Sequence, residues 1–345
     1  MKISSLSSLA INMGLRSTTA SLQENLVRLQ DEVVTGRFAD TGLEIGERMR
    51  DLTSLRNEIT RIEQFKVTQS RADTFLTGTQ DALSQVSDIA QDFMASLVPA
   101  IGDNLQRPLV SQSAADGLET AVARLNAQIG GVSLFGGENT DGSAMEDYEG
   151  SALQASVEAA FVTRFGFAIS DPATAGITAA QMDDFLANDL EPLFASPAWS
   201  GISNASDNAI VNRISDEVTV QIGVTANEEA VRDLFAGMVA AYAFYGSDLG
   251  ADALDSVGTF ALEKTSTSVN GFSQLRSEVG LTQARLARNG EQLDAQMRLL
   301  TTFTAEMEQV DVFEKSAELN SVITQIEISY SITSRVQQLS IMRFL

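Results

Sequence analysis

The feature that most constrains this chain is a seam of regularly spaced, mostly apolar residues in its first third. Steps of three and four residues separate the seam positions, with one skipped residue at Phe65. The positions are Leu52, Leu55, Ile59, Ile62, Phe65, Gln69, Ala72, Leu76, Thr79, Leu83, Val86, Ala90, Phe93 and Leu97. A seven-residue repeat of this kind is typical of coiled-coil helices. The seam predicts one long helix from about Leu43 to Leu97, ended by Pro99.

A second seam occupies the last third of the chain. Its positions are Phe272, Leu275, Val279, Thr282, Leu286, Asn289 and Leu293, followed at helical period by Met297, Leu300, Phe303, Met307 and Val310. Two long helices of similar length bury their seams most simply against each other. The predicted fold is therefore mainly α: a long antiparallel coiled-coil rod formed by both ends of the chain, with a smaller mixed α+β domain inserted in the middle.

The middle of the chain has a different composition. All five prolines and the single Trp199 lie between Pro99 and Trp199, and glycines are frequent after Val132. We expect a helix over Ser113–Gly131 capped by its glycine pair, and short strands in "SVEAAFVTRFGFAI" (156–169) and "EVTVQIGV" (217–224). Thr225 and Glu228 have the capping-box spacing, which predicts a helix that starts at Thr225.

Both extreme ends carry further apolar stripes. The first stripe is Leu15, Leu22, Leu26, Leu29 and Val33, and "TGRFADTG" interrupts it. Near the other end, "TQIEISYSIT" alternates like a strand, but its flanks have helical spacing, so we interpret it as a helix. Residues 319–345 then show one apolar face of Leu319, Val322, Ile323, Ile326, Tyr330, Ile341 and Phe344, and an opposite face of Ile328, Ile332 and Leu339. Because a helix with two apolar faces is buried on both, we expect one face to pack on the first stripe and the other on another subunit.

Composition limits the chemistry. The chain has no Cys and no His, so thiolate, imidazole-metal and histidine-base catalysis are excluded. The formal net charge of −23 disfavours nucleic acid and anionic membranes. We expect no membrane span, no cleaved signal and no cofactor. A calcium site in "GENTDGSAMEDYEG" (137–150) and acid/base work by Asp183 and Asp184 are minor alternatives to solvated acidic surface.

Three segments resemble the bacterial flagellin family. "TGLEIGERM" is similar to the block that opens the long N-terminal helix, through Gly42, Leu43, Ile45, Glu47, Arg48 and Met49. "LFGGENT" is similar to a segment of the hook-associated relatives, through Leu134, Phe135, Gly137 and Thr140. The C-terminal segment resembles the C-terminal helix of the flagellins and that of the hook-associated relatives. Within the family, the resemblance is closest to the hook-associated protein that joins hook and filament, and filament flagellin comes second. The residues directly before Gly42, "FADT", differ from those that filament flagellin and the hook-associated relative have at this place.

The resemblance implies a structural, non-enzymatic subunit exported by the flagellar type III system and working outside the cell. Its implied partners are its own copies, other axial proteins and an export chaperone. It implies an inner assembly domain (1–40 and 311–345), a rod domain (41–131 and 265–310) and an outer insert (132–264). We expect the terminal helices to be disordered in the free chain and to fold on assembly. A secreted coiled-coil needle or tip protein and a polysaccharide-acting enzyme are the alternatives.

Overall fold

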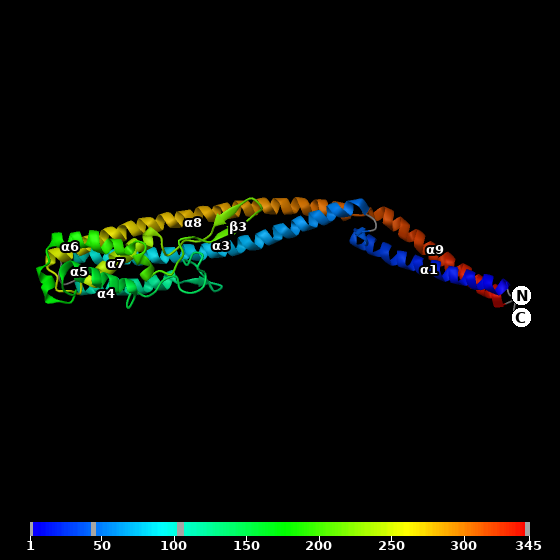
Figure 1. Ribbon diagram of the computed structural model, residues 1–345. Coiled ribbons are helices and arrows are strands. Elements are labelled where there is room, and N and C mark those ends of the chain that lie inside the picture. Colours follow the sequence, from blue (N-terminus) through cyan, green and yellow to red (C-terminus); the bar gives the residue numbers. More distant parts are fainter. Residues whose placement is uncertain (1–2, 43–45, 102–106, 342–345) are drawn as a thin grey trace. The chain divides into compact units, whose positions relative to one another are not determined.

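The computed structural model describes residues 3–42, 46–101 and 107–341 (Figure 1). The chain divides into two compact units. The terminal unit combines residues 1–63 with 293–345, and the central unit spans residues 64–292. Two long helices, α3 (Met49–Leu97) and α8 (Ala251–Glu308), contribute residues to both units. The predicted division into assembly domain, rod and insert stays a prediction.

In the terminal unit, α1 (Ile3–Thr35) packs side by side with α9 (Val312–Ile341) (Figure 1). The two helices run antiparallel, since Glu32 lies near Lys315 and Gln23 near Tyr330. The prediction that "TQIEISYSIT" is helical is confirmed, because this segment lies inside α9.

Two backbone hydrogen bonds hold the segment between α8 and α9 against the chain that follows α1. Gly36 ends α1 with a φ of 69°, a left-handed conformation that favours glycine. The chain after it pairs with the 308–310 segment: the Phe38 amide donates to the Glu308 carbonyl at 3.0 Å, and the Val310 amide donates to the Gly36 carbonyl at 3.0 Å. The 3₁₀ turn η1 (Gly46–Arg48) then leads into α3.

The central unit is built on the antiparallel pair of α3 and α8. Gln69 of α3 donates to the Asn289 side chain of α8 at 2.6 Å, and Gln283 of α8 donates to Thr77 at 3.2 Å. Polar members of the two seams thus meet each other. The predicted α3 seam is confirmed, because its positions from Leu52 to Leu97 are buried or half-buried. The 3₁₀ turn η2 (Val98–Ala100), which contains Pro99, follows α3.

Two more helices and the middle segments complete the core. Helix α4 (Arg107–Leu125) packs on α7 (Glu229–Phe244). The remaining elements are β1 (Gln128–Ile129), β2 (Val132–Ser133), α5 (Ala152–Phe165), η3 (Pro172–Gly176), α6 (Ala179–Phe185), the π-helix η4 (Leu186–Leu190), η5 (Glu191–Phe194), η6 (Ala198–Gly201), β3 (Val211–Arg213) and β4 (Thr219–Gln221). The strands form two antiparallel hairpins, β1–β2 and β3–β4. Phe161 lies at the centre of an aromatic cluster with Phe165, Phe167, Phe185 and Phe244.

The strand predicted within residues 156–169 is wrong. This stretch is mostly the helix α5, whose N-cap Ser151 accepts from the Gln154 amide and whose C-cap Gly166 has a φ of 84°. Its buried residues Leu153, Val157 and Phe161 recur every four residues, so caps and helical spacing override the β-branched and aromatic composition. The strand predicted in "EVTVQIGV" is confirmed as β4.

Two predicted helix boundaries are also wrong. The pair Gly130 and Gly131 forms the turn of the β1–β2 hairpin with φ values of 61° and 83°, as type I′ turns require, because α4 already ends at Leu125. Helix α7 begins at Glu229 and not at Thr225, since the Thr225 hydroxyl accepts from the Asn227 amide and closes a separate turn.

Candidate assembly surface

The inward face of the α1–α9 pair follows the same spacing on both helices. The α1 positions turned inward are Leu15, Thr19, Leu22, Leu26, Leu29 and Val33, and the α9 positions are Lys315, Ser316, Leu319, Val322, Ile326, Ser329 and Thr333. The five predicted stripe residues of α1 and the predicted Leu319 and Ile326 of α9 therefore lie together. Their packing holds the two ends of the chain side by side.

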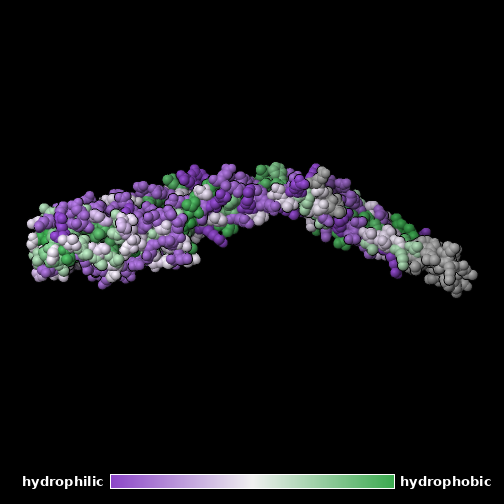
Figure 2. Space-filling model, viewed as in Figure 1, coloured by the Kyte–Doolittle hydropathy of each residue, from purple (hydrophilic) through white to green (hydrophobic). Residues whose placement is uncertain are grey.

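The outward face of α9 is apolar as well. The exposed fractions are 38% for Ile323, 53% for Ile328, 53% for Tyr330 and 46% for Ile332. Figure 2 shows hydrophobic patches along the α9 side of this pair. Ile328 and Ile332 lie one turn apart on the side of α9 that faces away from α1, and we call these two residues the outer α9 face. Ile323 and Tyr330 lie beside the contact with α1, on the other side of α9. Exposed apolar side chains grouped on one helix face are typical of interaction surfaces.

Ile323 and Tyr330 lie on the same side of α9 as Leu319, but at the edge of the contact with α1, where they stay exposed. One partner helix covers only a narrow stripe of α9, and Val322 and Ser329 fill the seam positions beside them. Tyr330 lies at the edge of the contact, where its hydroxyl accepts a hydrogen bond from Gln23 at 2.9 Å. Ile328 and Ile332 face away from α1, as predicted.

Two buried carboxylates, those of Glu32 and Glu308, bind basic side chains near the end of α1 and the start of α9. Glu32 of α1 is fully buried and accepts from Arg28 at 3.3 Å and from the Ala39 amide at 3.3 Å, with Lys315 of α9 at 3.8 Å. Glu308 at the end of α8 is 5% exposed and binds Arg56 at 2.5 Å and Arg37 at 3.4 Å. Charge-assisted hydrogen bonds of this kind are stronger than neutral ones.

Sequence reasoning missed these two carboxylates. The available signal was their place beside apolar seam residues, Glu32 next to Val33 and Glu308 next to Met307. Charged residues beside a buried seam are seldom left without partners. The arginine partners come from other segments, and spacing along the chain does not reveal them.

The start of α9 is set by Asp311. Its carboxylate accepts from the Phe313 amide at 2.9 Å and from the Glu314 amide at 3.2 Å, which satisfies free donors of the first turn. Phe313 itself is 91% exposed. The predicted site residue Phe344 and the motif residues Leu43 and Ile45 lie outside the described residues, as do the side chains of Leu339 and Glu47.

The remaining motif residues have structural roles in the central unit or at the start of α3. Leu134 and Phe135 are buried, and the Phe135 carbonyl accepts from the Ala226 amide at 2.8 Å. Gly137 has a φ of 62°, and an added Cβ would lie 2.5 Å from the Asn208 carbonyl oxygen. The Thr140 carbonyl accepts from the Ser133 amide at 3.2 Å. Gly42 and Arg48 are exposed, and Met49 is half-buried.

The acidic residues considered as alternative sites do not converge. Asp183 is exposed, and its neighbour Asp184 forms an ion pair with Arg164. Within the residues that the structure describes, no group of three or more acidic side chains is arranged to hold a metal ion. In the same residues, no helix combines the length and hydropathy that a membrane crossing requires.

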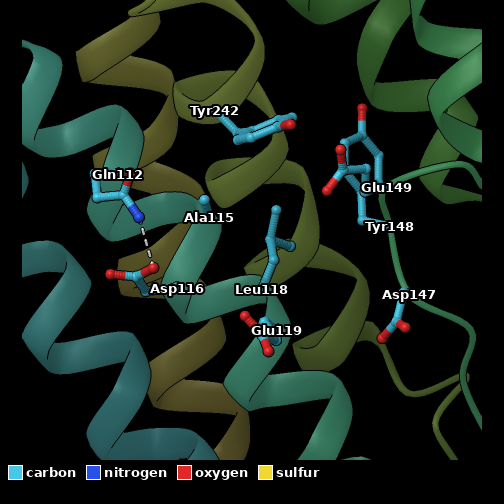
Figure 3. Close-up of a pocket in the computed structure, with 9 residues that line it drawn as sticks. All are labelled: Gln112, Ala115, Asp116, Leu118, Glu119, Asp147, Tyr148, Glu149 and Tyr242. Atoms are coloured by element: carbon cyan, nitrogen blue, oxygen red, sulfur yellow. Dashed lines mark hydrogen bonds between the residues drawn. The ribbon is translucent and has the colours of Figure 1, made fainter.

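The central unit also contains an open groove between α4 and the 147–149 segment (Figure 3). Its volume is about 520 Å³. The lining residues are Gln112, Ala115, Asp116, Leu118, Glu119, Asp147, Tyr148, Glu149 and Tyr242.

Paired terminal helices with an uncovered apolar face define a class of protein: a helical subunit that associates through its two ends. Comparisons with known proteins specify this class. The model of the bacterial flagellin N-terminal helical region matches residues 6–140, and that of the C-terminal helical region matches residues 262–345. These matches leave only residues 1–5 and 141–261 uncovered, so the chain belongs to the bacterial flagellin family.

One solved structure supports the fold, and a second is reported beside it. A protein of Vibrio parahaemolyticus, described as a flagellar hook-associated protein, is 12% identical with a TM-score of 0.54; the match covers 77% of this chain and 99% of that one. FlgL of Bacillus cereus is 12% identical with a TM-score of 0.48, over 73% of this chain and 99% of that one. A search of curated protein sequences finds no match.

Family membership sets the general function. The chain is a structural subunit of the bacterial flagellum, the motility organelle, and belongs with other axial proteins of that assembly. The predicted family and the predominantly helical fold class are thereby confirmed.

Proposed function

We propose that this chain is the junction subunit between hook and filament and that it assembles through the outer α9 face. The observation that carries the proposal is the two-sided apolar character of α9. One side packs on α1, while Ile328 and Ile332 on the opposite side are 53% and 46% exposed. A neighbouring subunit that covered this face would gain about 1 kcal/mol for each of these half-buried isoleucines that becomes fully buried.

The same proposal gives each part of the chain a task. Residues 1–40 and 311–345 form the inner assembly domain, 41–131 and 265–310 the rod, and 132–264 the outer insert. The subunit is exported unfolded by the flagellar type III system with the help of a chaperone and works outside the cell. It catalyses no reaction. Its lack of cysteine supports this route, because no disulfide has to form after export.

Filament flagellin is the second candidate function. Both matched family models describe flagellin regions, which favours this alternative as much as the junction role. Electron microscopy of the purified chain separates the two. Long filaments formed by the chain alone would indicate flagellin, whereas a chain that stays monomeric and joins only a preformed hook would indicate the junction subunit.

The assembly proposal is tested with two variants. Removal of Ser321–Leu345 is expected to abolish incorporation into flagella and to leave the central unit folded, as judged by Trp199 fluorescence. The double substitution Ile328→Ser and Ile332→Ser keeps α9 intact, because isoleucine and serine have similar helix propensities. It is also expected to prevent incorporation, while Ser331→Ala on the same helix is not. Normal assembly of the double variant would contradict the proposal.

A further inference from the structure

The central unit has a further groove, between strand β4 and helix α8. Its volume is about 250 Å³. Residues 219–223 of β4 and its extension form one wall, and residues 275–285 of α8 form the other. The buried side chains of Leu76 and Val279 add apolar surface to it. In Figure 1, β3 of the same hairpin lies alongside α3 and α8.

The wall formed by β4 is an open strand edge. The Ile222 amide donates to the Ile210 carbonyl at 2.9 Å, on the side of β3. Residues of an antiparallel strand alternate in the direction of their backbone groups, so the N–H and C=O groups of Thr219, Gln221 and Gly223 point away from β3. In the described part of the chain, these groups have no backbone partner. No described residue of β3 lines the groove, so the groove lies on this open side of β4.

The groove also carries opposite charges. Glu228 and Glu278 line it together, and burial, with the Glu278 carboxylate nearby, raises the pKa of Glu228. Arg285 lies two turns further along α8 and lines the groove as well. This arginine is exposed, and it forms no ion pair with the residues that the structure describes. A ligand that fits the groove therefore has a positive charge toward the glutamates and a negative charge toward Arg285.

Contacts of α8 show which end of β4 each charge accompanies. Gln69 donates to the Asn289 side chain at 2.6 Å and to the Ile214 carbonyl at 3.1 Å. Ile214 directly precedes the turn between β3 and β4, so the start of β4 lies toward residue 289 of α8. Arg285, one turn from Asn289, therefore accompanies the start of β4, and Glu278 accompanies its end. A segment paired antiparallel with β4 would begin near the glutamates and end near Arg285.

We propose that this groove binds an extended segment of a partner protein, which adds a strand to the open edge of β4. The segment has a basic residue at its start, which meets Glu228 and Glu278, and an acidic residue at its end, which meets Arg285. Backbone hydrogen bonds to the strand edge supply affinity in this mode of binding, and the side-chain contacts supply specificity.

A second copy of this chain fits the groove less well. Its β3 and β4 are already paired in a hairpin, and two strands about 4.8 Å apart are too wide for a groove of about 250 Å³. The site lies in the central unit and does not depend on the outer α9 face.

Amide hydrogen exchange of the full chain, followed by NMR with and without a peptide, tests the site. The probe is a seven-residue peptide with blocked ends, arginine first, glutamate last and alternating valine and threonine between them. We expect it to protect the amides of Thr219, Gln221 and Gly223, while the Ile222 amide, which already bonds to β3, changes little. The same peptide with arginine and glutamate exchanged is expected to bind about three- to tenfold more weakly.

Substitutions then locate the binding. Gln221→Pro removes an N–H that points away from β3, so it keeps the hairpin and is expected to weaken binding about threefold or more. Unchanged protection of the Ile222 amide shows that the hairpin is intact. Arg285→Gln is expected to weaken binding about two- to fivefold. The control Arg288→Gln, at an exposed arginine of the same helix outside the groove, is not.

Three results would overturn the proposal: no added protection of the three amides, equal affinity for the two peptides, or equal losses in Arg285→Gln and Arg288→Gln. Protection of the same amides that rises with the concentration of the chain alone would assign the groove to a second copy and would also overturn it.

Discussion

The central and terminal units bury their side chains to different depths. In the central unit, one continuous apolar core runs from Ala72 to Leu286 and includes fully buried phenylalanines of several elements. In the described part of the terminal unit, the buried apolar residues are Leu29, Leu52, Ile62, Leu293 and Val310. The central unit is therefore complete within one chain, whereas α1 and α9 cover each other on one side only.

This difference explains how one chain can be both a folded domain and an assembly element. Deep burial of apolar surface gives a unit its own stability, since it offsets the lost conformational entropy. A two-helix pair with exposed outer faces gains much less, so it opens more readily. Surface left uncovered in the free chain is then available to a neighbouring subunit.

The largest effect is expected for the aromatic core of the central unit. Phe161→Ala removes a fully buried ring that contacts four other phenylalanines, and we expect a loss of about 3–5 kcal/mol in the free energy of unfolding. Urea unfolding followed by Trp199 fluorescence measures it. The control Val162→Ala, at a 44% exposed position of the same helix, is expected to cost less than about 0.5 kcal/mol. Similar losses in both variants would mean that the core does not stabilise the unit as described.

An intermediate effect, confined to the terminal unit, is expected for Glu308→Gln. The change removes the charge that holds Arg37 and Arg56, and we expect a local loss of about 1–3 kcal/mol. Hydrogen exchange should speed up at the amides of Phe38 and Val310, which close the bridge to this segment. Glu306→Gln, at an exposed position two residues away on the same helix, is the control. A shift of the Trp199 transition instead would show that the two units do not respond separately.

The smallest effect is expected for Tyr245→Phe, and it depends on pH. Burial raises the pKa of Tyr245 to about 12. Between pH 10 and about 12 the unfolded chain therefore loses this proton while the folded chain keeps it, so stability falls as pH rises. The substitution should remove this contribution, about 1 kcal/mol at pH 11.

At pH 7 the same variant should be nearly unchanged. The Tyr245 hydroxyl is buried without a hydrogen-bond partner in the described residues, so its removal leaves no partner unsatisfied. Urea unfolding of both proteins at pH 7 and pH 11 checks the prediction. Equal pH dependence of the variant and the natural chain would contradict it.

Much of the fold could be predicted because helical seams are local patterns. A residue at a seam position faces the partner helix wherever the rest of the chain lies, so the positions from Leu52 to Leu97 and the α1 stripe were found from spacing alone. Polar seam members such as Gln69 and Asn289 fitted the same pattern, and in the structure they bind each other.

The errors came where a contact depends on the width or position of a partner. Ile323 and Tyr330 lie close to the inward face in a helical projection, but a single neighbouring helix leaves them 38% and 53% exposed. Phe303 continues the α8 pattern, yet it is 45% exposed, and Thr304 faces inward instead. The groove between α4 and the 147–149 segment could not be predicted either, because Tyr148 and Tyr242 meet only through the fold.

Hydrogen exchange of the free chain and of chain incorporated into flagella tests the central claim most directly. In the free chain, we expect the amides of α9 (312–335) to exchange about a thousandfold faster than those of α7 (229–244), since opening α9 exposes little apolar surface. On incorporation, the α9 amides should become protected while those of α7 stay unchanged. Equal protection of the two helices in the free chain, or no gain in α9 on assembly, would contradict the account.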